Sequence, residues 1–197
     1  MTDSVPTIDA ARAALLLLDY QPGLLASLVD EDGLVARAQA ALASARARRV
    51  AVGYVRVALT DAEAAAVPST NKSFAAAAAA GRLREGSPAS QVDGRVAPQP
   101  GDIVVRKLRV GAFSTTNLDE QLRIRGINTL ILAGISTSGA VLSTVRDAAD
   151  RDYLLYVLAD ACADSDADKH NVLLGKVFPR QAYVITAADL DGLLTAG

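Results

Sequence analysis

Six short stretches of almost unbroken apolar residues constrain the fold of this chain more than any other feature. Runs that are apolar at nearly every position are typical of strands buried on both faces of a parallel sheet. Segments with helical spacing separate most of the runs; one of them, residues 32–49, places its apolar side chains on one helix face. Strand and helix alternation of this kind predicts an α/β fold with three layers, Rossmann-like in arrangement. The runs are residues 14–18, 50–59, 102–107, 129–134, 153–160 and 182–186.

Composition limits the classes of function. The 197 residues are 51% hydrophobic, enough for one core, and we expect a single domain over residues 1–197. Lys and Arg number 20 against 22 Asp and Glu, and only 4% of residues are aromatic, so nucleic-acid binding has little support. A single cysteine excludes an internal disulfide framework and fits a reducing cytoplasm. No signal peptide or membrane-spanning run is expected, which indicates a cytoplasmic protein. The expected partner is a small-molecule substrate.

Residues 60–101 interrupt the alternation. They hold most of the prolines, no clear strand and one Ala-rich segment, residues 72–80, that is expected to be a helix. Long loops on compact α/β domains often act as substrate lids. A surface insertion or a subunit contact is the alternative interpretation.

Polar residues at the ends of the apolar runs indicate where a ligand would bind. In open parallel sheets, ligands bind outside the carboxyl ends of the strands. Asp19 ends the first run, Lys107 ends the third, and the small residues 136–140 follow the fourth. We therefore expect Asp19, Lys107 and this turn to meet in one crevice.

An aspartate and a lysine in a sheltered crevice can form an acid/base unit. The alternative is a structural ion pair at the strand ends. The turn of small residues precedes a helix, where open backbone amides favour an anion or a developing oxyanion.

Other chemistry has few candidates. Cys162 is interpreted as a small buried residue, and His170, the only histidine, as a packing or helix-surface residue. One His and one Cys argue against a zinc or iron centre, so no metal is expected. The first strand is not followed by G-x-G-x-x-G, and no P-loop is present. We expect no cofactor.

Three blocks of this sequence together resemble the isochorismatase-like hydrolases, also called the cysteine hydrolase superfamily. The blocks are "ALLLLDYQPGLL", "VVRKLRVGAFSTTNLDEQLRIRGINTLILAG" and "GISTSGAVLSTVRDAADRDYLLYVLADACAD". The resemblance covers almost the entire chain. It implies a six-stranded parallel sheet between helices and a homodimer or larger oligomer. It also implies Asp19 and Lys107 as the catalytic Asp and Lys.

The third block departs from the family pattern at the nucleophile. Where the family has G-[VI]-x-T-x-x-C-V, this chain has "GISTSGAV", so Ala140 occupies the position of the nucleophilic cysteine. The resemblance also implies a cis peptide bond between Ile135 and Ser136, and oxyanion-hole amides at Ser136 and Ala140. The Asp-x-His metal motif of nicotinamidases is replaced by "YVRVALTD" here.

Three interpretations of Ala140 remain open. Isochorismatases also lack this cysteine and cleave a vinyl ether, with the Asp as general acid and the Lys orienting an acidic substrate. A relative that binds a small molecule without turnover is the second interpretation. A Cys-to-Ala variant of a cysteine amidase is the third.

Substrate contacts are inferred from position. Isochorismatases usually have a His where this chain has Ser138, so the resemblance does not single out isochorismate. Arg side chains near the crevice favour a small anionic substrate, although Arg56 could instead pair with a carboxylate such as Asp61. The candidate substrate-binding residues are Gln21, Leu24, Arg56, Asn71, Phe113, Ser136, Ser138 and Gly139.

Overall fold

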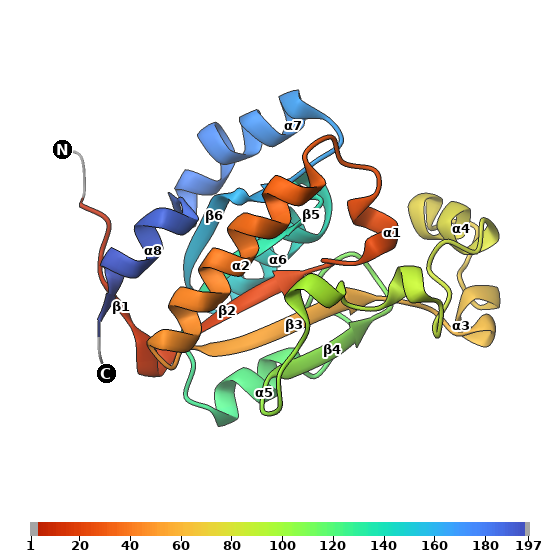
Figure 1. Ribbon diagram of the computed structural model, residues 1–197. Coiled ribbons are helices and arrows are strands. Elements are labelled where there is room, and N and C mark those ends of the chain that lie inside the picture. Colours follow the sequence, from red (N-terminus) through yellow and green to blue (C-terminus); the bar gives the residue numbers. More distant parts are fainter. Residues whose placement is uncertain (1–3, 196–197) are drawn as a thin grey trace.

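A six-stranded parallel sheet forms the centre of the computed structural model, which describes residues 4–195 (Figure 1). The strand order is β4-β3-β2-β5-β6-β7. Each of the six apolar runs forms one of these strands, so the predicted fold class and strand number are confirmed. The strands are β2 (Ala13–Leu18), β3 (Ala51–Val57), β4 (Ile103–Lys107), β5 (Thr129–Ile135), β6 (Leu154–Ala163) and β7 (Tyr183–Ile185).

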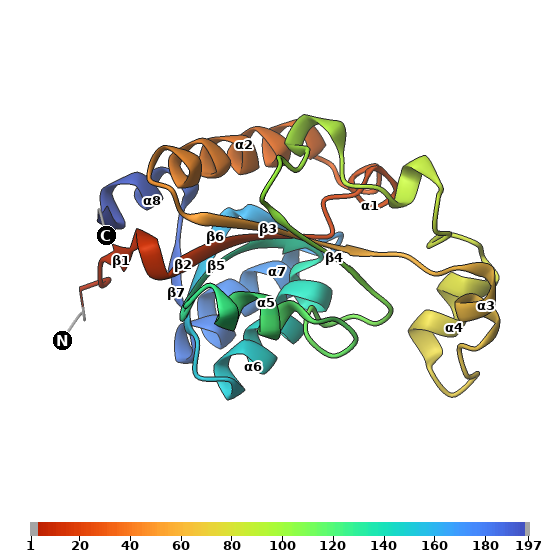
Figure 2. The same cartoon turned by 90° about the horizontal axis from the view of Figure 1, so that it is seen from below.

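Helices cover both faces of the sheet (Figure 2). The helices α2 and α8 lie on one face, and α5, α6 and α7 lie on the other. A short parallel pair, β1 (Ile8–Asp9) with β8 (Leu194–Thr195), joins the two ends of the described chain. The helices are α1 (Pro22–Leu25), α2 (Glu31–Ala47), α3 (Asp61–Ala65), α4 (Lys72–Ala79), α5 (Leu118–Ile124), α6 (Leu142–Asp150), α7 (Ala167–Val172) and α8 (Ala187–Leu193).

The central strand β2 shows why the runs are unbroken. Leu15 and Leu17 pack towards α2 and α8, whereas Leu16 and Leu18 pack towards α5 and α6. Every residue of β2 is buried, as expected for a strand with helices on both sides. Full burial of each leucine side chain contributes roughly 1.5–3 kcal/mol.

The strand order places the switch point of the sheet at the carboxyl ends of β2 and β5. From β2 the chain proceeds to β3 and β4 on one side, then returns to β5 on the other side of β2. Connections that leave two neighbouring strands in opposite directions open a crevice at their ends. Gly134 lets these strand ends approach closely, because a Cβ atom there would lie 2.7 Å from Leu18 Cβ. Asp19 and the turn after β5 therefore lie on either side of this switch point, where a ligand crevice is expected.

The helices α3 and α4 of the 60–101 segment extend beyond the carboxyl ends of β3 and β4, and the rest of the segment returns to α2, where Val96 is buried (Figures 1 and 2). The predicted helix in this segment is α4. The segment also contains α3, which begins with a capping box between Thr60 and Glu63. Arg106 of β4 pairs with Glu63 at 2.7 Å, which ties α3 to the sheet.

Among the described residues, no helix has the length and apolar character needed to cross a membrane.

Candidate functional site

Asp19 and Lys107 form a buried ion pair at the crevice. Lys107 Nζ lies 2.7 Å from Asp19 Oδ2, although β3 separates their two strands in the sheet. The register explains the contact. Leu18 pairs with Val55, whereas Lys107 pairs with Val57, so β4 extends further and its lysine reaches across the end of β3. The sequence prediction that these two side chains meet is confirmed.

The environment of Asp19 makes its carboxyl a weaker acid than an exposed aspartate. Burial raises the pKa of this carboxyl to about 6, with the Lys107 ammonium opposing the shift. Asp19 Oδ1 is buried and has no hydrogen-bond partner among residues 4–195. A carboxyl group with a pKa near neutrality and one oxygen unused is suited to proton transfer.

Lys107 is oriented by two contacts. Besides Asp19, its ammonium group donates to the backbone oxygen of Val110 at 2.6 Å. An ammonium group has three N–H donors. The remaining donor can serve a ligand in the crevice.

The turn after β5 leads from the sheet into α6. The peptide bond between Ile135 and Ser136 is cis, as the resemblance implied. Residues Thr137–Val141 form a wide, π-type turn that leads into α6. A Cβ atom on Gly139 would lie 2.7 Å from Ser136 Oγ, so a larger residue there would require this hydroxyl to rotate away. Ala140 is buried at the start of the helix.

Two side chains from the chain segment after β6 hold this turn, and sequence reasoning missed both. Asp164 Oδ2 accepts a hydrogen bond from the Ser138 amide at 2.7 Å. Thr137 Oγ1 lies 2.8 Å from His170 Nδ1. His170 was interpreted as a packing or helix-surface residue, but it contacts the turn directly. The Ser138 amide therefore donates to Asp164 and is not free for a ligand. The expected oxyanion donors, at Ser136 and Ala140, precede and follow it in the sequence.

Gln21, a candidate substrate contact, uses its amide group within the protein. Its Nε2 donates to the backbone oxygens of Val57 and Ser90 at 2.9 and 2.7 Å, and its Oε1 accepts from the Val57 amide at 2.8 Å. Its observed contacts therefore position the end of β3.

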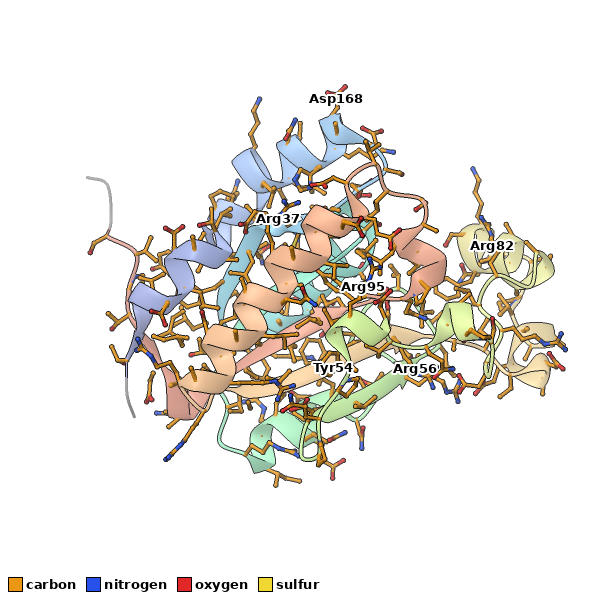
Figure 3. The ribbon with its side chains drawn as sticks, viewed as in Figure 1. Arg37, Tyr54, Arg56, Arg82, Arg95 and Asp168 are labelled. Carbon is orange, nitrogen blue, oxygen red and sulfur yellow. The ribbon has the colours of Figure 1, made fainter. Side chains whose placement is uncertain are left out.

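Arg56, the second polar candidate, is paired with Glu85 by two contacts of 2.8 and 2.9 Å (Figure 3). The sequence analysis expected that Arg56 could pair with a carboxylate, and this is confirmed. The residue suggested as its partner, Asp61, was wrong. Asp61 pairs with Arg84 instead. Arg56 thus ties the 60–101 segment to β3.

The remaining candidates occupy different surroundings. Leu24 is partly buried against the core, and Phe113 is buried and stacks on Tyr153 with ring centroids 6.1 Å apart. Asn71 caps α4 by accepting a hydrogen bond from the Phe74 amide. The structure brings Ser136, Ser138 and Gly139 together at the turn, and it shows neither Phe113 nor Asn71 bonded to Asp19 or Lys107.

Cys162 lies in β6 and is buried. Burial raises the pKa of its thiol to about 12, so it is a poor nucleophile. Within residues 4–195, no group of three or more His, Cys, Asp or Glu side chains is arranged to hold a metal ion.

Sequence comparisons identify relatives of this chain. Residues 13–189 match the Isochorismatase domain family. The chain is 33% identical, over 88% of its length and 89% of the relative, to the uncharacterized isochorismatase family protein YwoC of Bacillus subtilis. A shorter match, 39% identical over 49% of this chain and 38% of the relative, is to the ureidoacrylate amidohydrolase RutB of Methylobacterium radiotolerans. Another, 32% identical over 53% of this chain and 49% of the relative, is to the maleamate amidohydrolase of Pseudomonas putida.

Solved structures share the fold over nearly the full chain. An isochorismatase family protein from Burkholderia thailandensis superimposes with a TM-score of 0.82 and 31% identity, covering 96% of this chain and 98% of that one. A cysteine hydrolase from Pseudomonas syringae pv. phaseolicola gives a TM-score of 0.85 and 25% identity over 98% and 97%.

Proposed function

The chain belongs to the isochorismatase family, and on that premise we propose that it is a metal-independent hydrolase using Asp19 and Lys107 without a thiol nucleophile. The observation that carries the proposal is the state of Asp19. This carboxyl is buried, its pKa is raised to about 6, and one oxygen is without a partner beside an ammonium group.

Ala140 determines the type of reaction. Its methyl group has no electron pair with which to attack a carbonyl carbon, and the chain's only cysteine is the buried Cys162. Covalent amide hydrolysis at position 140 is therefore not part of the proposal. A reaction that begins with protonation fits the remaining groups better.

Hydrolysis of an enol ether is such a reaction. Asp19 donates its proton to the terminal carbon of the C=C bond, and the electron pair of that bond forms the new C–H bond. Water adds to the resulting oxocarbenium carbon and returns one proton to Asp19. The hemiketal then collapses to a ketone and an alcohol, so atoms and charge balance. Lys107, with one N–H donor to spare, orients the substrate.

The substrate is proposed to be a small organic anion. Ureidoacrylate and maleamate, the compounds named for two of the amidohydrolase relatives, are both small carboxylates. The Lys107 ammonium and the expected oxyanion donors at Ser136 and Ala140 offer a carboxylate complementary charge. We also propose, as the sequence analysis expects, that the protein forms a homodimer and is located in the cytoplasm.

Turnover by the wild type and the Asp19→Asn variant tests the proposal. A panel of small carboxylates containing an enol ether, an ester or an amide is incubated with each protein, and products are followed by NMR. We expect wild-type hydrolysis of the enol ethers and its loss in Asp19→Asn with ligand binding retained. Absence of wild-type turnover across the panel, with ligand binding retained, contradicts the proposal and supports a binding protein. Hydrolysis of the amides alone contradicts the enol-ether step.

A further inference from the structure

A second hollow, of about 300 Å³, lies at the carboxyl end of β6. The link between α1 and α2, the start of α2, the end of β6 and α7 form its walls. Asp19 and Lys107 do not line it. Its volume is at the lower end of the range for small-molecule sites. The lining residues used below are Leu28, Leu34, Arg37, Cys162, Asp164 and His170.

The charges of the hollow do not balance. Arg37, which extends from α2 (Figure 3), is neutralised by Asp30 at 2.9 Å and also donates to the Asp160 backbone oxygen. Asp164 has no Lys, Arg or His partner within salt-bridge distance among the described residues. Its oxygens accept hydrogen bonds from the Ser138 and Asp166 amides only.

His170, the remaining basic side chain of the lining, is uncharged at neutral pH. Burial lowers the pKa of His170 below its ordinary value. The lining therefore has a net charge of about −1, located at Asp164. Leu28 supplies apolar surface beside it, and the buried side chains of Leu34 and Cys162 lie behind this part of the lining. A carboxylate next to apolar surface is complementary to an organic cation.

The polar wall of the hollow contacts the 136–140 turn. Asp164 and His170 line the hollow, and the same two side chains contact Ser138 and Thr137 of the turn. A ligand that draws either side chain towards itself changes a hydrogen bond that holds the turn. Such a ligand acts on the anion site without entering the crevice.

We propose that this hollow is a second ligand site, which takes a small organic cation with one ammonium group on an apolar skeleton, and that its occupant shifts the 136–140 turn through Asp164 and His170. The binding itself is independent of the proposed hydrolysis. Only an effect on turnover rests on the proposed function.

Three matched probes test the site: benzylammonium, benzyl alcohol and benzoate. His170 is the only histidine of the chain, so its ring resonances report binding without ambiguity in NMR titrations. We expect saturable shifts with benzylammonium at about millimolar concentration, as usual for a ligand of this size. Benzyl alcohol should bind about fivefold more weakly, because it lacks the ion pair with Asp164 and one partly exposed ion pair changes an affinity by about this factor. Benzoate should bind more weakly still. The amide resonances of residues 136–140 should move at the same concentrations.

Two variants locate the binding. Asp164→Asn removes the charge but keeps an oxygen that can accept from the Ser138 amide, and it should abolish the preference for benzylammonium over benzyl alcohol. Asp168→Asn is the matched control, because this exposed aspartate lies four residues later, on α7, and points outward (Figure 3). It should leave the preference unchanged.

A third variant covers the case in which Asp164→Asn does not fold. Ala167→Trp places a ring at the rim of the hollow, at an exposed position. It should remove binding of benzylammonium and benzyl alcohol alike. Equal affinities for the three probes, or a preference that survives both Asp164→Asn and Ala167→Trp, would overturn the site. Binding that leaves the 136–140 amides unmoved would overturn its coupling to the turn, whatever the hydrolysis assay shows.

Discussion

Lys107 Nζ lies 2.7 Å from Asp19 Oδ2 in a setting where the two side chains are only 1% and 6% exposed. Removing one partner of such a pair leaves an uncompensated buried charge, which costs about 3–5 kcal/mol. We predict that Lys107→Met lowers the free energy of unfolding by about this amount at pH 8. The loss should be smaller at pH 5, because Asp19 without its cation stays protonated and neutral there. Denaturant unfolding at the two pH values measures both effects.

The matched control for this variant is Lys169→Met. Lys169 also pairs with an aspartate, Asp166, at 2.9 Å, but it is exposed. Exposed pairs contribute about 0–1 kcal/mol, so its loss should change stability little at either pH. Equal effects of Lys107→Met and Lys169→Met would show that the buried pair has no special role in stability.

The pKa of Asp19 sets the pH dependence of the proposed reaction. Burial raises this pKa from 3.8 to about 6, so the free protein keeps the proton up to about pH 6 and loses it above. If Asp19 is the general acid, kcat/KM for an enol ether should be highest below pH 6 and fall tenfold per pH unit well above it. Asp19→Asn should lower kcat by about 10²–10⁴-fold. A rate that increases through pH 6 would instead indicate that Asp19 acts as a base.

Arg56 and Glu85 tie the 60–101 segment to the sheet through two contacts of 2.8 and 2.9 Å. We predict that Glu85→Gln increases the rates of amide hydrogen exchange in α3 and α4 about fivefold. The loss of one partly exposed ion pair favours local opening by about this factor. Asp61→Asn removes the exposed pair with Arg84 in the same segment and should have little effect.

KM measurements on variants of the same pair test the predicted substrate contact of Arg56. If Arg56 acts only through the tether, Arg56→Ala and Glu85→Ala should raise KM equally. If Arg56 also touches the substrate, Arg56→Ala should raise KM further than Glu85→Ala does. A KM that changes in neither variant would leave the segment without a role in substrate binding.

The sequence predicted the central pair because its position depends on strand ends alone. Asp19 and Lys107 each end an apolar run, and parallel strands that are buried on both faces end at one edge of the sheet. The helix face formed by Leu34, Val35 and Ala38 was also predictable, since the 3.6-residue period appears directly in the sequence.

The contacts that position the turn and the 60–101 segment were not predictable in this way. The partner of Arg56 is Glu85, 29 residues later in a segment without a strand period. His170 reaches Thr137 across 33 residues, which requires knowing how α7 is rotated against β5. The helix α3 has five residues, too few for periodicity, and the capping pair Thr60 and Glu63 was its only local signal.

Ala140 offers the sharpest test of the turn. It is buried at the start of α6, where backbone amides favour negative charge. We predict that a thiol introduced by Ala140→Cys has a pKa below its ordinary value of about 8.5. The pH dependence of iodoacetamide alkylation measures this pKa, in a Cys162→Ala background that leaves a single thiol. Cys162 of the wild type is the internal comparison, because burial raises its pKa to about 12 and it should stay unreactive at neutral pH. A thiol at position 140 with an unshifted or raised pKa would mean that the turn does not stabilise an anion, and the proposed binding of a substrate carboxylate there would lose its basis.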